Sequence, residues 1–130
     1  MTKLMIVDDS NIIRNRIERS MDNMDIEVVA TASNGEDAVE LFMQHRPDLI
    51  TMDLTMPKVD GLECIKRIRA LSSDVSILVV SALSDRQTGL RALQYGARGF
   101  ICKPFTEEQL MLAFNKLLAN HQKMLKDARK

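Results

Sequence analysis

Acidic, hydroxyl and ammonium side chains stand directly after four short apolar runs of this sequence. Each run is too short for a helix and is rich in apolar or β-branched residues, which is typical of a buried strand. The runs and the residues that follow them are 3–7 with Asp8 and Asp9, 49–52 with Asp53, 76–80 with Ser81, and 99–102 with Lys103. In an open parallel sheet the carboxyl ends of the strands share one edge. We therefore expect these side chains to converge on one pocket.

Three carboxylates in one pocket favour a metal site. Asp8, Asp9 and Asp53 would repel one another, and burial would make ionising all three costlier still. A divalent cation relieves this repulsion, and Mg²⁺ prefers oxygen ligands, including one or two carboxylates and a phosphate oxygen. The pattern therefore predicts a site for Mg²⁺, with Mn²⁺ as a substitute and without His or Cys ligands.

Each of these residues has a structural explanation when it is taken alone. The Asp8-Asp9 pair could cap a helix, Asp53 could be a turn residue, Ser81 a loop hydroxyl and Lys103 a solvated charge. The functional interpretation rests on their joint occurrence at four strand ends.

Helices are predicted between the strands. Apolar residues recur at one-turn spacing after each run, and Ile26 to Ala30 adds a further strand. The first helix is expected near Asn11 with Ser10 or Asp9 as its cap. The other inward-facing positions are Ile13, Ile17 and Met21; Ala38, Val39, Leu41 and Phe42; Leu62, Ile65 and Ile68; Leu90 and Leu93; and Leu110, Phe114 and Leu117. Strands that alternate with helices predict an α/β fold with a parallel sheet covered on both faces.

Capping-box patterns predict where the last two helices begin. Ser84-x-x-Gln87 opens the fourth, which Gly96 ends, and Thr106-x-x-Gln109 opens the fifth. We expect the fifth helix to reach about Asn120 and then to fray, because a basic end with little to pack on is marginal. Residues 1–120 are thus predicted as one domain and residues 121–130 as a short basic tail.

Composition excludes several classes of function. Lysines plus arginines equal aspartates plus glutamates, 18 against 18, so no global field favours direct nucleic-acid binding. No apolar run approaches the roughly 18 residues that span a bilayer. The charge at Asp8 interrupts any signal-peptide core. Cys64 and Cys102 lie in apolar patterns and are expected as buried, reduced thiols, and His45 and His121 as surface or boundary residues. A cytoplasmic protein is therefore expected.

The combined motifs resemble the receiver domain of bacterial two-component response regulators, most closely the single-domain chemotaxis type. The matching residues, within about residues 3–118, are Asp8-Asp9, Asp53-x-x-Met56-Pro57-x-x-x-Gly61, Ser81-Ala82, Phe100 and Lys103-Pro104-Phe105. The resemblance implies a doubly wound, flavodoxin-like fold: a five-stranded parallel sheet of order 2-1-3-4-5 with five helices on its two faces.

The resemblance also implies roles for the residues of the site. Asp53 would accept a phosphoryl group from a phosphohistidine of a histidine kinase or phosphotransfer protein, or from a small acyl phosphate. Asp9, Asp53 and the backbone carbonyl of Thr55 would bind Mg²⁺ directly, and Asp8 through water. The phosphoryl group would be bound by Ser81, Ala82 and Lys103.

A switch and a partner surface are implied as well. The Lys103-Pro104 bond would be cis and would aim the lysine into the pocket. Phe100 lacks the hydroxyl of the tyrosine found in many family members, so any switch that it makes must be one of packing. The surface expected to bind a downstream protein, or a second copy of the phosphorylated chain, carries Leu83, Arg86, Phe100 and Gln109.

Two alternatives remain open. The chain could be the receiver half of a longer regulator with a DNA-binding or enzymatic part. It could also be a Mg²⁺-dependent phosphohydrolase with an aspartyl intermediate, although such enzymes of the haloacid-dehalogenase type carry a second Asp where Thr55 stands. A dinucleotide site is disfavoured, because the acidic residues after Val7 do not suit a pyrophosphate.

Overall fold

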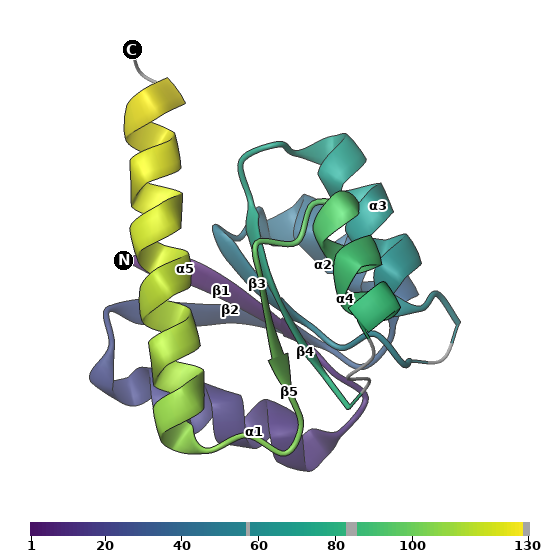
Figure 1. The fold of residues 1–130 in the computed structure, drawn as a ribbon, viewed down its shortest axis with the longest axis horizontal. Helices are drawn as coiled ribbons and strands as arrows, with labels where there is room; N and C mark the ends of the chain where they lie inside the picture. Colours follow the sequence, from purple (N-terminus) through teal and green to yellow (C-terminus); the bar gives the residue numbers. More distant parts are fainter. Residues whose placement is uncertain (57, 83–85, 129–130) are drawn as a thin grey trace.

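The structure is a computed structural model and describes residues 1–56, 58–82 and 86–128. Within these ranges five parallel strands form one sheet in the order β2-β1-β3-β4-β5 (Figure 1). The strands are β1 (Thr2–Val7), β2 (Ile26–Ala32), β3 (Leu49–Met52), β4 (Ser76–Ser81) and β5 (Gly99–Cys102). The predicted fold class and strand order are confirmed. The strand β2 runs two residues beyond its predicted end at Ala30.

Helices cover both faces of the sheet. They are α1 (Asn11–Ser20), extended by the short 3-10 helix η1 (Met21–Asn23), α2 (Gly35–His45), α3 (Gly61–Leu71), α4 (Arg86–Gln94) and α5 (Glu107–Ala128). Leu4 and Ile6 of β1 pack with α1 and α5, whereas Met5 and Val7 pack with α2 and α3 on the other face. This alternation builds two hydrophobic cores, one on each side of the sheet. No helix in the described ranges has the length and apolarity to cross a bilayer.

Strand register brings the chemical side chains to one edge. The last residues of β1 and β3 pair with each other, so Asp8 and Asp53, which follow them, leave the sheet side by side. Ser81, the last residue of β4, pairs with the last residue of β5. The next residue, Lys103, donates its backbone N–H to the Ser81 carbonyl at 2.8 Å. The convergence predicted at the carboxyl ends of the strands is therefore confirmed.

Side-chain caps fix two of the helix starts expected from sequence. Ser10, rather than Asp9, caps α1 by accepting the Ile13 N–H at 3.3 Å. The Thr106-Gln109 capping box is confirmed, because each residue donates its backbone N–H to the side chain of the other, at 2.9 and 3.1 Å. The predicted cap Ser84 lies outside the described residues.

The buried face of α4 differs from the prediction. Leu90 and Leu93 were expected to point inward, but their side chains are 53% and 50% exposed. Ala92 is buried instead, and Tyr95 is half-buried against the same core. Because α4 turns this side toward the core, its two leucines lie in solvent. Gly96, with φ +117, ends the segment as predicted.

The two cysteines differ in burial. Cys64 is buried in the core and Cys102 is exposed, and neither forms a disulfide. The prediction of a buried thiol is therefore wrong for Cys102. Its exposure follows from its place at the end of β5, the edge strand of the sheet.

The helix α5 is longer than predicted. Its stripe of Leu110, Phe114 and Leu117 is buried as expected, but the helix passes Asn120 and continues to Ala128. His121, expected as a surface or boundary residue, is only 5% exposed, and its Nδ1 lies 2.7 Å from Oγ of Ser76. This contact gives the last turns a polar anchor on the sheet. The division of the chain at residue 120 stays a prediction, although α5 crosses it.

We predict that Gly61→Ala destabilises the fold and that Gly89→Ala does not. A Cβ on Gly61 would lie 2.1 Å from the Asp53 carbonyl oxygen, so backbone must move, at a cost of about 1–3 kcal/mol or more. A Cβ on Gly89 of α4 meets only Phe100 ring carbons at 4.0 Å, so alanine should stabilise the helix by up to about 1 kcal/mol. Urea unfolding measures both, and equal effects would contradict the expectation.

Candidate functional site

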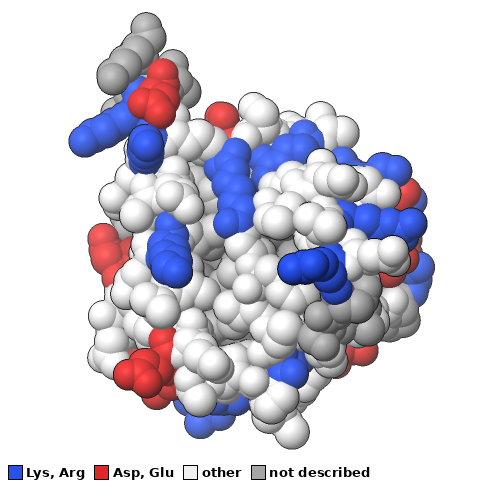
Figure 2. Space-filling model, viewed as in Figure 1, with Lys and Arg blue, Asp and Glu red and all other residues white. Residues whose placement is uncertain are grey.

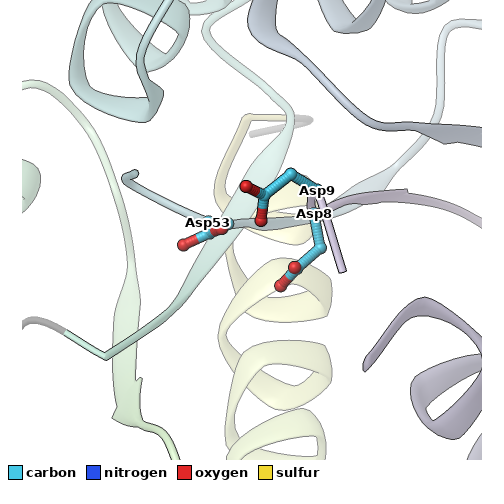
Figure 3. A group of neighbouring side chains, drawn as sticks. All are labelled: Asp8, Asp9 and Asp53. Atoms are coloured by element: carbon cyan, nitrogen blue, oxygen red, sulfur yellow. The ribbon is translucent and has the colours of Figure 1, made fainter. Parts of the chain in front are cut away.

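Three carboxylates form the centre of the site, at the carboxyl ends of β1 and β3. Asp8 and Asp53 are each 1% exposed, whereas Asp9 is exposed. One oxygen from each lies within 4.8 Å of the others, and Figure 3 shows the three groups gathered over the strand ends. We call these three residues the acidic site. At this separation the buried charges of Asp8 and Asp53 repel each other, and either a proton or a nearby cation relieves the repulsion.

Lys103 provides one cation. Its Nζ lies 2.8 Å from Asp8 Oδ2 and 3.7 Å from Asp53 Oδ2. The Lys103-Pro104 peptide bond is cis, as predicted. The ammonium group thus lies between the two buried carboxylates, and the flexible lysine side chain can shift toward whichever of them carries more negative charge.

The hydrogen bonds around the acidic site leave oxygen atoms for a metal. Asp8 Oδ1 accepts the Ser10 N–H at 2.9 Å, and Asp53 Oδ1 accepts the Thr55 N–H at a long 3.4 Å. Asp8 Oδ2 is buried and, despite its ion pair with Lys103, accepts no hydrogen bond from any described residue. A set of carboxylate oxygens with spare acceptor capacity suits a hard cation such as Mg²⁺.

Electrostatics make Asp53 the unusual acid of the site. Burial, followed by the charge of Asp8, raises the pKa of Asp53 to about 6, whereas Lys103 and the Thr55 N–H oppose this shift and Asp9 adds to it. The carboxyl group therefore gains a proton far more readily than an ordinary aspartate. A cation that binds its ionised form would compete with that proton.

The other predicted site residues border this centre. Ser81 is fully buried at the end of β4, and Ala82 beside it is exposed. Thr55 is exposed and lines a hollow together with Asp9, Met56 and Thr88. This hollow opens beside Asp9, the exposed member of the acidic site. Pro57 and Leu83 lie outside the described residues.

Two arginines of α1 support the site and were not predicted. Arg14 Nη1 donates to the Asp8 carbonyl at 2.6 Å. Arg16 Nη2 donates to the Phe105 carbonyl at 2.7 Å, and its guanidinium lies 4.6 Å from the Phe105 ring centroid. They hold the backbone that presents Asp8 and the turn that follows Lys103. Nothing in the helical pattern separates these arginines from solvated ones, because their targets are backbone atoms.

A groove beside β5 contains part of the predicted partner surface. We call it the β5–α5 groove; it measures about 470 Å³ and is lined by Leu78, Arg98, Gly99, Phe100, Ile101, Cys102, Pro104, Gln109, Leu112, Ala113, Lys116, Leu117 and Asn120. Figure 2 shows the hollow on this face with Lys and Arg side chains around it. Phe100 is half-buried, and Gln109 and, on α4, Arg86 are exposed. The residues of this lining include two bases and no acid.

The fold and the acidic site together define a class of protein. The sequence profile of the response regulator receiver domain matches residues 4–115, and the chain belongs to that family. It is a receiver domain homologous to the chemotaxis protein CheY and to the receiver domains of longer response regulators.

Individual relatives cover most of the chain. The sequence is 40% identical to chemotaxis protein CheY of Bacillus subtilis, over 89% of this chain and 97% of that protein. It is 35% identical to CheY of Thermotoga maritima, over 88% and 96%. The solved CheX-CheY-BeF3-Mg complex of Borrelia burgdorferi contains a similar fold, with a TM-score of 0.87 at 28% identity, over 90% of this chain and 89% of that one.

We predict that Asp53→Asn stabilises the metal-free protein. The folded-state pKa of about 6 exceeds the ordinary 3.8, so the folded state loses stability as pH rises from about 4 to about 6 and remains weakened above that. Near neutral pH the variant should therefore unfold with a free energy about 1–3 kcal/mol higher than the wild type in chelator. Urea unfolding across this pH range measures the difference.

The matched control is Asp22→Asn, at an exposed aspartate of η1. Its unfolding free energy should stay within about 0.5 kcal/mol of the wild type. A neutral-pH destabilisation by Asp53→Asn would show that the charge of Asp53 is not a cost to this fold.

Proposed function

We propose that this protein is a phosphorylation-controlled signalling switch that accepts a phosphoryl group on Asp53. One observation carries the proposal: two buried carboxylates, an exposed one and a lysine ammonium meet at adjacent strand ends. This set of groups can hold a cation and a phosphoryl group together, and the family membership of the chain supports the same use.

The covalent step takes place at the Asp53 carboxylate. One oxygen attacks the phosphorus of a phosphohistidine, or of a small acyl phosphate, and forms a new P–O bond. The P–N bond of the donor, or the P–O bond of the acyl phosphate, breaks, and its electron pair leaves with the imidazole or carboxylate. The chain assists its own modification in this way and acts as a signalling protein rather than as an enzyme on a separate substrate.

Positioning and charge do most of the work in such a transfer. Lys103 places its ammonium against the phosphoryl oxygens, and the Ser81 hydroxyl with the adjacent Ala82 backbone binds another oxygen. Asp9, Asp53 and the Thr55 carbonyl would hold Mg²⁺ or Mn²⁺ directly, and Asp8 would act through water. The cation would neutralise charge on the carboxylates and on the phosphoryl group.

Output is proposed to follow from a change in packing. Ser81 would move toward the new phosphoryl group, and Phe100 would turn inward to fill the vacated space. Phe100 is suited to this because it is half-buried between α4, where Gly89 leaves room beside its ring, and the β5–α5 groove. The phosphoryl group shifts a population between two packings, and only through its different interaction with each.

The partner surface is proposed to be the α4-β5-α5 face, with Leu83, Arg86, Phe100 and Gln109. Exposed Leu90, Leu93 and Leu112 offer apolar contacts there, and the bases that line the groove favour an acidic partner segment. Upstream, a histidine kinase or phosphotransfer protein would supply the phosphoryl group. Downstream, an effector protein or a second copy of this chain would bind. A cytoplasmic location, expected from the unpaired cysteines, is part of the proposal.

A second possibility is a receiver unit within a longer regulator. The chain is 42% identical to a protein-glutamate methylesterase of Nocardioides over 78% of its own length but only 29% of that protein. The same switch would then act on an attached domain. A phosphohydrolase has less support, because Thr55 stands where such an enzyme needs a second acid.

We predict that acetyl phosphate labels Asp53 alone and only with Mg²⁺ or Mn²⁺. The acidic site must be neutralised before an anionic donor can approach. Mass spectrometry of the intact protein and of its peptides follows the mass gain. Asp53→Asn should not label, and Asp22→Asn should label like the wild type. Lys103→Ala should still accept some phosphate while losing much of its coupling to partner binding. Labelling of Asp53→Asn, or labelling in chelator, would refute the mechanism.

We predict that Ser81 and Phe100 move together in a beryllofluoride complex. Ser81→Ala should leave Asp53 labelling intact but weaken phosphate-dependent partner binding about fivefold, the loss expected for one hydrogen bond. Ser73→Ala, at the exposed serine before β4, is the matched control and should bind normally. A crystal structure with both side chains unmoved, together with full partner binding, would place the switch elsewhere.

A further inference from the structure

A buried polar cluster lies at the amino-terminal edge of the sheet, at the opposite end of the strands from the acidic site. Ser76, the first residue of β4, is fully buried. Its Oγ lies 2.7 Å from Nδ1 of His121 and accepts a hydrogen bond from Arg98 Nη1 at 2.9 Å. Three separate segments, namely the starts of β4 and β5 and the second half of α5, therefore meet at one hydroxyl group.

The cluster has no part in the proposed phosphoryl transfer. Its histidine lies beyond residues 4–115, the range that matches the family profile. It also stands where sequence reasoning expected a fraying tail. The long α5 of this chain is what delivers the imidazole to the sheet.

His121 is the anchor of the last turns of α5. Among the side chains described for residues 118–127 it alone is buried, and the others are half-buried or exposed. In Figure 1 the yellow end of α5 extends beyond the sheet. A terminal segment with so little apolar contact is marginal as a helix, so a single polar contact to the sheet can contribute much of its order.

Protonation of the imidazole ring would add a second positive charge to this buried cluster. Because Ser76 Oγ accepts from Arg98, its own proton is available to Nδ1 of an unprotonated His121, whereas an imidazolium would have to donate to the same oxygen to which the Arg98 guanidinium already donates. Burial lowers the pKa of His121 below its ordinary 6.5, and Arg98 adds to this effect. Asp48 before β3 and Asp74 before β4 oppose the shift without reversing it.

We propose that Ser76, Arg98 and His121 form a proton-sensitive clasp, which ties α5 to the start of β4 and keeps residues 118–128 helical at neutral pH, and which releases them on mild acidification. In the released state His121 is solvated and takes a proton at its ordinary value, whereas the closed clasp resists protonation. The closed form therefore has its full stability relative to the open form above about pH 6.5 and loses stability as the pH falls below that value.

Opening of the clasp would also change the proposed partner surface. Arg98 of the clasp also lines the β5–α5 groove, as does Asn120, the neighbour of His121 in the chain. Opening the clasp removes the turn of α5 that forms this end of the groove. Protonation at the clasp would thus change the same surface that the phosphoryl switch is proposed to control from the other end of the sheet.

Amide hydrogen exchange of the full chain at about pH 7.5 and about pH 5.5, corrected for intrinsic rates, tests the clasp. Complete protonation of the open state alone predicts up to about tenfold more opening of residues 118–128 at the lower pH. His45→Gln, at an exposed histidine in the last turn of α2, should behave like the wild type. His121→Gln should lose this pH dependence. Ser76→Ala should open about two- to tenfold more at neutral pH, the effect of losing one hydrogen bond.

An NMR titration of the wild-type His121 ring gives a second measurement that needs no variant. The ring of the closed protein should titrate below pH 6.5, whereas the loss of protection in the same segment should already begin near pH 6.5, where the open state takes up its proton. Equal protection at both pH values in the wild type would overturn the proposal. The same loss of protection in His121→Gln as in the wild type would overturn it too.

Discussion

The register between β1 and β3 imposes an electrostatic cost on which the rest of the site depends. Their last residues pair, so Asp8 and Asp53 must leave the sheet side by side and buried. The result is a carboxyl group whose pKa is raised to about 6, chiefly by burial and by the Asp8 charge. The backbone hydrogen bonds of the sheet keep the two carboxylates together in spite of their repulsion. A cation that binds between them would relieve this repulsion, and that relief would strengthen its binding.

The other groups of the site balance the negative charge of Asp8 and Asp53 or hold the backbone around them. Lys103 reaches it from the end of β5, where its backbone is tied to β4 through the Ser81 carbonyl. Arg14 and Arg16 of α1 fix the backbone on which Asp8 and the Lys103 turn depend. A group bound at the acidic site would therefore affect β4, β5 and α1 together, because all three are linked to the site by these contacts. This connection gives the proposed switch a physical route to the β5–α5 groove.

The two ends of the sheet carry different chemistry. At the carboxyl ends, exposed and buried acids suit a metal and a phosphoryl group. At the amino ends, a neutral histidine and a serine fasten α5 across the start of β4. Arg98 of the clasp lines the β5–α5 groove, and so do Cys102 and Pro104, the chain neighbours of Lys103. On the two proposals made above, phosphorylation and protonation would both act on this groove.

The sequence by itself determined the strands, their order through the family motifs, the acidic site, the Thr106 cap and the cis bond before Pro104. These features are local or recur as fixed motifs, so residue type and spacing suffice to predict them. Tertiary structure decided the burial of His121, the full length of α5, the exposure of Cys102 and the inward face of α4. Each depends on which distant surface a side chain meets: His121 contacts Ser76, 45 residues earlier in the chain, and helical periodicity cannot indicate such a partner.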